Sequence, residues 1–130
     1  MDIKKVVVIG SGTMGSGIAA HLCNANVPVT LLDLTTEISE QARERIKKSR
    51  PPLLIDKSKI DNIDVGNIND NFNVVSEADW VVEAVVERID IKHNIYEKIS
   101  TSNWYFIRSS LYGQGFICFV RPYSTWCYSC

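Results

Sequence analysis

The chain has 130 residues, a formal net charge of −1 and 45% hydrophobic residues, which suits one domain with a single core. The near-neutral charge argues against a nucleic-acid partner or an anionic membrane surface. No apolar run approaches the roughly 20 residues of a membrane-spanning helix, and the N-terminus lacks a signal-peptide pattern. Residues 1–99 contain one cysteine, Cys23, as is usual in a reducing cytosol. We therefore expect a cytoplasmic protein without membrane contact.

A glycine-rich segment near the N-terminus is the strongest motif. The uninterrupted apolar run 6–9 predicts a strand buried on both faces. A G-x-G-x-x-G segment follows, then a predicted helix over residues 13–24 and a second strand from Val27 to Asp33. This strand–glycine loop–helix–strand–acid order is typical of a site for the pyrophosphate of a dinucleotide.

Each part of the motif has a physical role. Gly10 permits a tight turn after the strand, and Gly12 lets the backbone approach the pyrophosphate closely. Gly15 allows the helix to pack closely on the strand, and the helix N-terminus attracts the phosphates. Asp33 lies near the spacing expected for the acid that binds ribose hydroxyls. Because a carboxylate repels a 2′-phosphate, the motif favours NAD over NADP.

The later elements follow from periodicity and turn residues. Thr35 offers an N-cap, and Asn26 is expected to end the first helix in a left-handed conformation. We expect helices over residues 37–48 and 90–99, a short helix near 57–60, a turn at 64–67, and strands at 72–76 and 80–84. This order predicts an α/β fold: a Rossmann-like half of a doubly wound parallel sheet with strand order 3-2-1-4.

Two carboxylates mark the carboxyl end of the predicted fourth strand, where ligands bind in open α/β sheets. Glu83 and Glu87 can bond ribose or face a substrate. Alternatively, Glu83 is half-buried in its strand and Glu87 caps the next helix. The residues by themselves leave both interpretations open.

Taken together, the glycine loop with its Met14, the strand ending at Asp33 and the segment 78–87 resemble the NAD-binding domain of L-3-hydroxyacyl-CoA dehydrogenase. The resemblance covers residues 3–99. It implies an NAD-dependent enzyme of fatty-acid β-oxidation that oxidises the 3-hydroxyl of an acyl-CoA. It also implies that Glu87 and Lys92 contact the cofactor, and that the region matching residues 38–62 helps to hold CoA.

The resulting set of predicted cofactor-binding residues combines the motif with the resemblance. For Met14, simple packing is the alternative to ligand contact. No metal site and no catalytic residue are predicted. The set consists of Gly10, Ser11, Gly12, Thr13, Met14, Gly15, Asp33, Glu87 and Lys92.

The sequence also departs from the family. The family's Ser-Asn-Thr-Ser strand end and its catalytic His in a His-Phe-Phe-Asn-Pro segment do not occur here. The two histidines, His21 and His93, fall on predicted helices and are expected to be surface or packing residues. We therefore expect a catalytically incomplete NAD-binding portion, with acyl-CoA as partner only if a C-terminal domain completes it. The alternatives are a stand-alone nucleotide-binding or regulatory module acting with another chain, and a hydroxyacid dehydrogenase, which the joint motifs disfavour.

The composition changes near residue 100. All 15 acidic residues lie in residues 1–99, whereas residues 100–130, here called the tail, are rich in aromatic residues. We expect an incomplete NAD-binding domain at 1–99 and an irregular, non-family tail derived from a frameshift or truncation. Alternatively, segments 104–107 and 116–120 add strands to the sheet edge as an interaction element. The C-x-x-C at 127–130 is a weak metal or redox signal.

Overall fold

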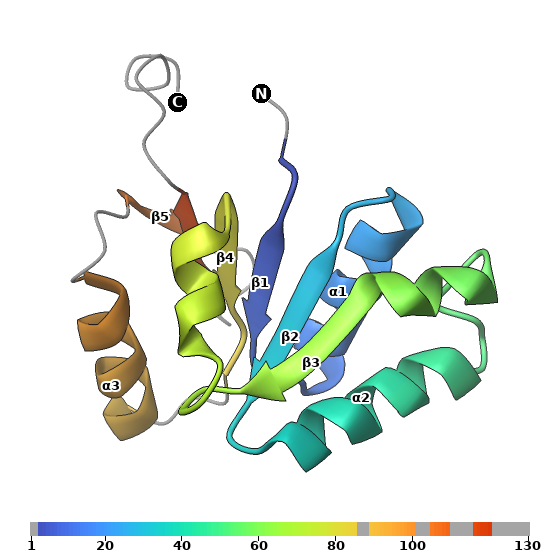
Figure 1. Cartoon of the computed structure of the whole chain (residues 1–130), viewed down its shortest axis with the longest axis horizontal. Coiled ribbons are helices and arrows are strands. Elements are labelled where there is room, and N and C mark those ends of the chain that lie inside the picture. The colour runs from blue at the N-terminus through green and yellow to red at the C-terminus, as the bar shows by residue number, and fades with distance from the viewer. Residues whose placement is uncertain (1–2, 86–88, 101–104, 110–115, 121–130) are drawn as a thin grey trace.

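A mixed β-sheet with four parallel strands, flanked by helices on both faces, forms the centre of the computed structural model (Figure 1). The structure describes residues 3–85, 89–100, 105–109 and 116–120. Within these residues the elements, in chain order, are β1 (Val6–Ile9), α1 (Thr13–Asn24), β2 (Val29–Asp33), α2 (Thr36–Lys48), η1 (Lys57–Asn62), β3 (Ile63–Asn67), η2 (Phe72–Glu77), β4 (Trp80–Glu83), α3 (Ile89–Ser100), β5 (Tyr105–Ser109) and β6 (Phe116–Val120). Here η denotes a 3₁₀ helix.

The parallel strands follow the order β3-β2-β1-β4, which confirms the predicted 3-2-1-4 topology. Val8 of β1 lies opposite Leu31 of β2 on one side and Val82 of β4 on the other. The carboxyl ends of β1 and β2 therefore meet at the same edge of the sheet. The glycine loop and Asp33 both belong to that edge.

The third strand lies elsewhere than predicted. Residues 64–67, expected as a turn, belong to β3, and residues 72–76, expected as a strand, lie in the 3₁₀ helix η2. β3 ends the sheet, so it tolerates the exposed Asp64 and the turn-forming Asn67. Gly66 fits because an added Cβ would lie 2.7 Å from the side-chain oxygen of Asn71. Tertiary contacts thus override local propensity on both segments.

The hydrophobic core has two halves, one on each face of the sheet. Val6 and Val8 face α1 and α2, where they pack with Ala19, Cys23 and Ile46. Val7 and Ile9 point to the other face, together with Ile95 and Ile99 of α3. All four residues of β1 are fully buried, so the prediction of a strand covered on both faces is confirmed.

The predicted helix ends are also confirmed. Thr35 caps α2, since its hydroxyl accepts a hydrogen bond from the Ile38 N–H at 3.4 Å. Asn26 follows α1 with a φ of 61°, the left-handed conformation expected there. The short helix expected near residue 57 is η1. None of the described helices is long and apolar enough to cross a membrane.

The tail contributes strands to the sheet. β6 pairs antiparallel with β4, placing Phe119 opposite Val81, and β5 pairs antiparallel with β6. The expectation of an irregular tail is therefore wrong for residues 105–109 and 116–120, which extend the edge beside β4. Antiparallel strands at the edge of a parallel sheet are a common arrangement. The C-x-x-C at 127–130 lies outside the described residues.

Candidate functional site

The turn after β1 needs a glycine at its first position. Gly10 has a φ of 103°, and its N–H donates to the carbonyl of Leu32 at 2.7 Å. A Cβ at this position would lie 2.6 Å from the carbonyl oxygen of Ala84. The turn therefore combines a left-handed backbone with contact to β4, and the predicted role of Gly10 in a tight turn is confirmed.

The other two motif glycines differ sharply in their surroundings. A Cβ on Gly15 would lie 1.8 Å from the carbonyl oxygen of Gly10, so only glycine lets α1 approach the loop this closely. A Cβ on Gly12 would meet nothing within 4 Å, and Gly12 is exposed. Close packing at Gly15 is thus confirmed. The open side of the loop lies at Gly12, where the motif expects the pyrophosphate.

The N-terminus of α1 is free of side-chain capping in the part of the chain described. Gly12 occupies the N-cap position, and no side chain bonds to the first turn. The first bond into the helix runs from the Ser16 N–H to the Gly12 carbonyl at 2.9 Å. The N–H groups of Thr13, Met14 and Gly15 precede that bond and have no partner within the helix. Donors and helix dipole together favour an anion beside Gly12.

The carboxylate of Asp33 lies directly beside this loop. Its Oδ2 accepts hydrogen bonds from the N–H of Ser11, at 2.7 Å, and from the Ser11 hydroxyl. Its Oδ1 accepts from the N–H of Leu34 at 2.7 Å. The motif acid and the glycine loop, far apart in the sequence, therefore form one hydrogen-bonded unit.

The carbonyl of Ser11 receives two contacts that sequence reasoning missed. Arg45 on α2 donates from Nη2 at 2.8 Å, and the hydroxyl of Ser16 donates at 2.9 Å. Ser16 stands inside the motif, so its position hinted at a role. For Arg45 the sequence holds no such signal, because it lies in the last turns of α2, where a cation also suits the helix dipole.

The other predicted contacts are only partly described. Met14 is 51% exposed at the loop, so the alternative of simple packing does not fit it. Lys92 belongs to α3, but its side chain and the whole of Glu87 lie outside the described residues. Glu83 is fully buried at the end of β4, and its Oε1 accepts from the Val85 N–H at 2.6 Å. Glu83 is therefore more deeply buried than expected, since the alternative interpretation placed it half-buried in its strand.

The two histidines lie on exposed helix surfaces. His21 is in the last turn of α1, roughly 12 Å along the helix axis from Thr13 at its start. His93 is on α3, on the opposite face of the sheet from α1. Both positions fit the expectation of surface residues. Among the described residues, no cluster of His, Cys, Asp or Glu could hold a metal ion.

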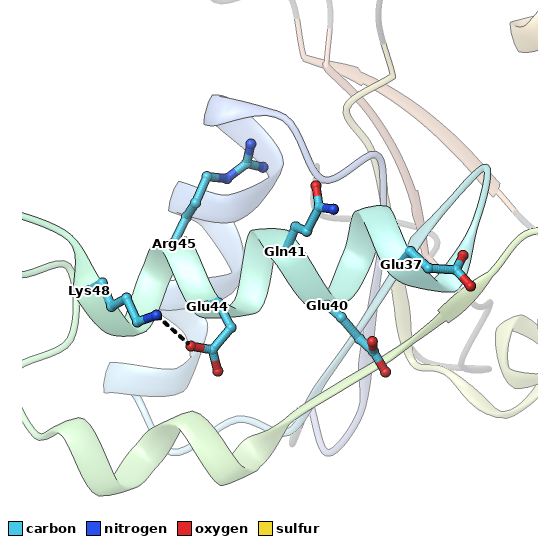
Figure 2. A pocket seen from close by; sticks show the side chains of 6 residues that line it. All are labelled: Glu37, Glu40, Gln41, Glu44, Arg45 and Lys48. Carbon is cyan, nitrogen blue, oxygen red and sulfur yellow. Dashed lines mark ion pairs between the residues drawn. The ribbon is translucent and has the colours of Figure 1, made fainter.

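Two surface depressions border α2. One follows the helix surface itself and is lined by Glu37, Glu40, Gln41, Glu44, Arg45 and Lys48 (Figure 2). The other lies at the C-terminal end of α2 and is lined by Lys47, Lys48, Ser49, Arg50, Pro52 and Lys57. The first has three carboxylates, whereas the second has four cationic side chains. The second therefore suits an anionic ligand.

Comparison with known proteins matches this geometry to a family. Residues 5–103 match the family described as 3-hydroxyacyl-CoA dehydrogenase, NAD binding domain. A protein of Deinococcus radiodurans named "Probable 3-hydroxyacyl-CoA dehydrogenase" is 41% identical over an alignment of 106 residues, and the match covers 76% of this chain and 31% of that protein. The chain thus spans about a third of that relative's length.

Solved structures of other proteins are also similar to this chain. FadB2 of Mycobacterium tuberculosis superposes with a TM-score of 0.65 and 28% identity, covering 78% of this chain and 38% of that one. A diketoreductase gives a TM-score of 0.64, also with 28% identity and the same coverage. The open loop at Gly12, the uncapped α1 and the Asp33 carboxylate fit a dinucleotide, so NAD is the cofactor of this fold. The chain belongs to the 3-hydroxyacyl-CoA dehydrogenase family, and its residues 5–103 match that family's NAD-binding domain.

Proposed function

We propose that the loop from Gly10 to Gly15 and Asp33 bind the adenosine half of NAD for a 3-hydroxyacyl-CoA dehydrogenase. The observation that supports this best is the open, uncapped start of α1 at Gly12, next to the Asp33 carboxylate. The pyrophosphate would accept hydrogen bonds from the N–H groups of Thr13 and Met14. The remaining acceptor capacity of Asp33 would hold a ribose hydroxyl.

The proposed reaction is oxidation of the 3-hydroxyl of an acyl-CoA. Bound NAD would supply the hydride acceptor. The described residues of this chain bind and orient; we assign no general base among them, because both histidines lie on exposed helix surfaces. We therefore propose a catalytically incomplete NAD-binding portion at 1–99 with a non-family tail, located in the cytoplasm. Glu87 and Lys92 remain proposed cofactor contacts on the strength of the resemblance.

The basic depression at the end of α2 supports a CoA partner. Lys47, Lys48, Arg50 and Lys57 bring four cations to one small surface, and Ser49 adds a hydroxyl. CoA carries a 3′-phosphate and a pyrophosphate, so it presents the anionic groups that such a surface attracts. The depression lies at the far end of α2 from Asp33, a helix of 13 residues. The proposed CoA site is therefore separate from the Asp33 carboxylate, which precedes the start of α2.

Calorimetry with NAD and NADP tests the cofactor site. We expect NAD to bind more tightly than NADP, and Asp33→Ala to weaken NAD about tenfold through loss of charge-assisted hydrogen bonds. Asp61→Ala is a matched control, because the Asp61 side chain is 85% exposed and pairs with Arg43 at 3.6 Å instead. Equal NAD affinity in Asp33→Ala and the wild type would refute the assignment.

Binding of CoA and pantetheine tests the basic depression. We expect Lys57→Glu to weaken CoA severalfold and leave pantetheine, which has no 3′-phosphate, unchanged. Lys98→Glu on α3 is the control, since α3 covers the opposite face of the sheet. Equal loss in both variants would argue against a specific site.

A turnover assay separates an incomplete portion from a working enzyme. The purified chain, mixed with NAD and a 3-hydroxyacyl-CoA, should form no NADH. Measurable turnover would refute the proposed incompleteness. NAD binding without turnover, restored to activity only by another chain, would favour the alternative of a module acting with a partner.

A further inference from the structure

Ser11 is held on both sides of its backbone. On one side, its N–H and hydroxyl donate to Asp33. On the other side, its carbonyl accepts from Arg45 Nη2 at 2.8 Å and from the Ser16 hydroxyl at 2.9 Å. Of the residues that bond to Ser11, Arg45 is the most distant in sequence, and its side chain reaches the loop from α2.

The carbonyl of Ser11 belongs to the same planar peptide group as the N–H of Gly12. In a trans peptide these two bonds point in opposite directions. Holding the carbonyl toward Arg45 and Ser16 therefore aims the Gly12 N–H to the other side. Gly12 is exposed, and a Cβ there would meet nothing within 4 Å. Glycine follows this peptide at position 12 and has a wide range of allowed φ, so without such contacts the Ser11–Gly12 peptide could rotate more easily than between two larger residues.

The surroundings of Arg45 differ from those of Arg43 on the same helix. Arg43 pairs with Asp61 at 3.6 Å and donates to the Ile60 carbonyl at 3.4 Å. Among the described residues, no carboxylate lies within ion-pair distance of Arg45. In Figure 2 the Arg45 side chain points away from the Glu44–Lys48 ion pair. Its charge is therefore directed to the Ser11 carbonyl rather than to a surface acid.

We propose that Arg45 is a positioning residue of the dinucleotide site, which orients the Ser11–Gly12 peptide so that the Gly12 N–H donates to the pyrophosphate. A cation bonded to the carbonyl also polarises the peptide and strengthens its N–H as a donor. This role rests on the proposed binding of NAD. It concerns the pyrophosphate and not the adenosine ribose, which Asp33 would hold.

Arg45→Met tests the proposal, because methionine replaces the aliphatic part of the arginine side chain and removes the hydrogen-bond donor and the charge. We expect NAD and ADP-ribose to bind about tenfold more weakly, as for loss of a charge-assisted hydrogen bond. Adenosine, which lacks the pyrophosphate, should bind within about twofold of the wild type by NMR titration. Arg45→Lys should recover part of the NAD affinity, because it restores a charged donor.

Arg43→Met is the matched control. This substitution removes the same charge from the same helix, but the Arg43 side chain bonds to the Ile60 carbonyl and not to the loop. NAD affinity should therefore stay within about twofold of the wild type. Unchanged NAD affinity in Arg45→Met would overturn the proposal. An equal loss for NAD and adenosine would also overturn it, because it would mean general damage to the loop.

Amide hydrogen exchange in the free protein separates this proposal from the proposed function. If Arg45 orients the loop, the Ser11 and Ser16 amides should exchange faster in Arg45→Met than in Arg43→Met. Equal exchange would refute the role of Arg45. If the wild type fails to bind NAD, the proposed function fails, whereas the exchange result still decides whether Arg45 holds the loop.

Discussion

Ser11 and Asp33 are joined by two hydrogen bonds to a single oxygen, since the N–H and the hydroxyl of Ser11 both donate to Asp33 Oδ2. The Leu34 N–H donates to the other oxygen, Oδ1, at 2.7 Å. A carboxylate has about four acceptor positions, and three are taken within the chain. The backbone bonds orient the carboxylate. The Ser11 hydroxyl, in contrast, occupies a position that a ribose hydroxyl could use.

Ser11→Ala should therefore tighten NAD binding. The substitution keeps the Ser11 N–H bond to Asp33 and frees one acceptor position for the ribose. We expect a gain of about two- to fivefold in affinity, the scale of one neutral hydrogen bond, measured by calorimetry. Ser58→Ala is the control, because Ser58 donates its N–H and hydroxyl to Asp56 Oδ1 in the same way. Weaker NAD binding in Ser11→Ala would show that the hydroxyl contacts the ligand instead.

The glycines of the first turns of α1 should respond oppositely to alanine. Gly15→Ala places a Cβ 1.8 Å from the Gly10 carbonyl oxygen, so backbone must shift, and we expect a loss of at least about 3 kcal/mol in the free energy of unfolding. Gly17→Ala places its Cβ in open space within the helix, and should stabilise the chain by about 0.5–1 kcal/mol. Urea unfolding of the ligand-free variants measures both. Similar stabilities for the two variants would contradict the packing of α1 against the loop.

Cys23 should lower the free energy of unfolding as the pH rises in the alkaline range. Burial raises the pKa of its thiol from 9.0 to about 11, while nearby Lys59 lowers it. Since the folded chain keeps the thiol protonated, its stabilising contribution is complete below pH 9. It is lost as the pH rises from 9 to 11, by at most about 1.4 kcal/mol per pH unit.

The measurement for Cys23 is urea unfolding between pH 8 and 11. Cys23→Ala removes the titrating group, so its free energy of unfolding should fall less steeply over this range than that of the wild type. The substitution also leaves a small cavity, which lowers stability at every pH and does not change the slope. Parallel curves for the two proteins would contradict the buried, protonated thiol.

The tail hypothesis predicts a feature of the coding DNA. If residues 100–130 arose from a frameshift, translation of another frame beyond codon 99 should yield a strand followed by Ser-Asn-Thr-Ser. The family match ends at residue 103, close to the change in composition. The absence of such a continuation in every frame would refute the hypothesis. It would favour the alternative, in which the tail strands β6 and β5 form a genuine edge to the sheet.

Much of the fold could be predicted because the deciding signals are local. The apolar run of β1, the glycine loop and the acid ending β2 specify a strand, a turn and a ligand edge within residues 6–33. Thr35 marks the start of a helix by its capping hydroxyl, and Asn26 marks the end of another by its left-handed backbone. The strand order followed from the handedness of strand–helix–strand connections.

The third strand was misassigned because the decisive contacts are not local. Residues 72–76 resemble a strand by composition, and residues 64–67 resemble a turn. The sheet nevertheless pairs β3 with β2, and Ser39 on α2 donates its hydroxyl to the Gly66 carbonyl at 2.8 Å. An edge strand pairs with only one neighbouring strand and can leave one face exposed, so it tolerates polar residues. Those polar residues break the apolar pattern by which a strand is predicted from the sequence.

For the site, the sequence by itself determined which residues meet at the edge where the ligand is proposed to bind: Gly10 and Gly15, because only glycine fits the turn and the helix contact there, and Asp33, because it ends the neighbouring strand. Only the tertiary structure decided how these residues are held. The bond from Arg45 to the Ser11 carbonyl joins residues 34 positions apart, and the Asp33–Ser11 pair joins residues 22 apart. Such contacts depend on where α2 and β2 lie against β1, and no local periodicity encodes that position.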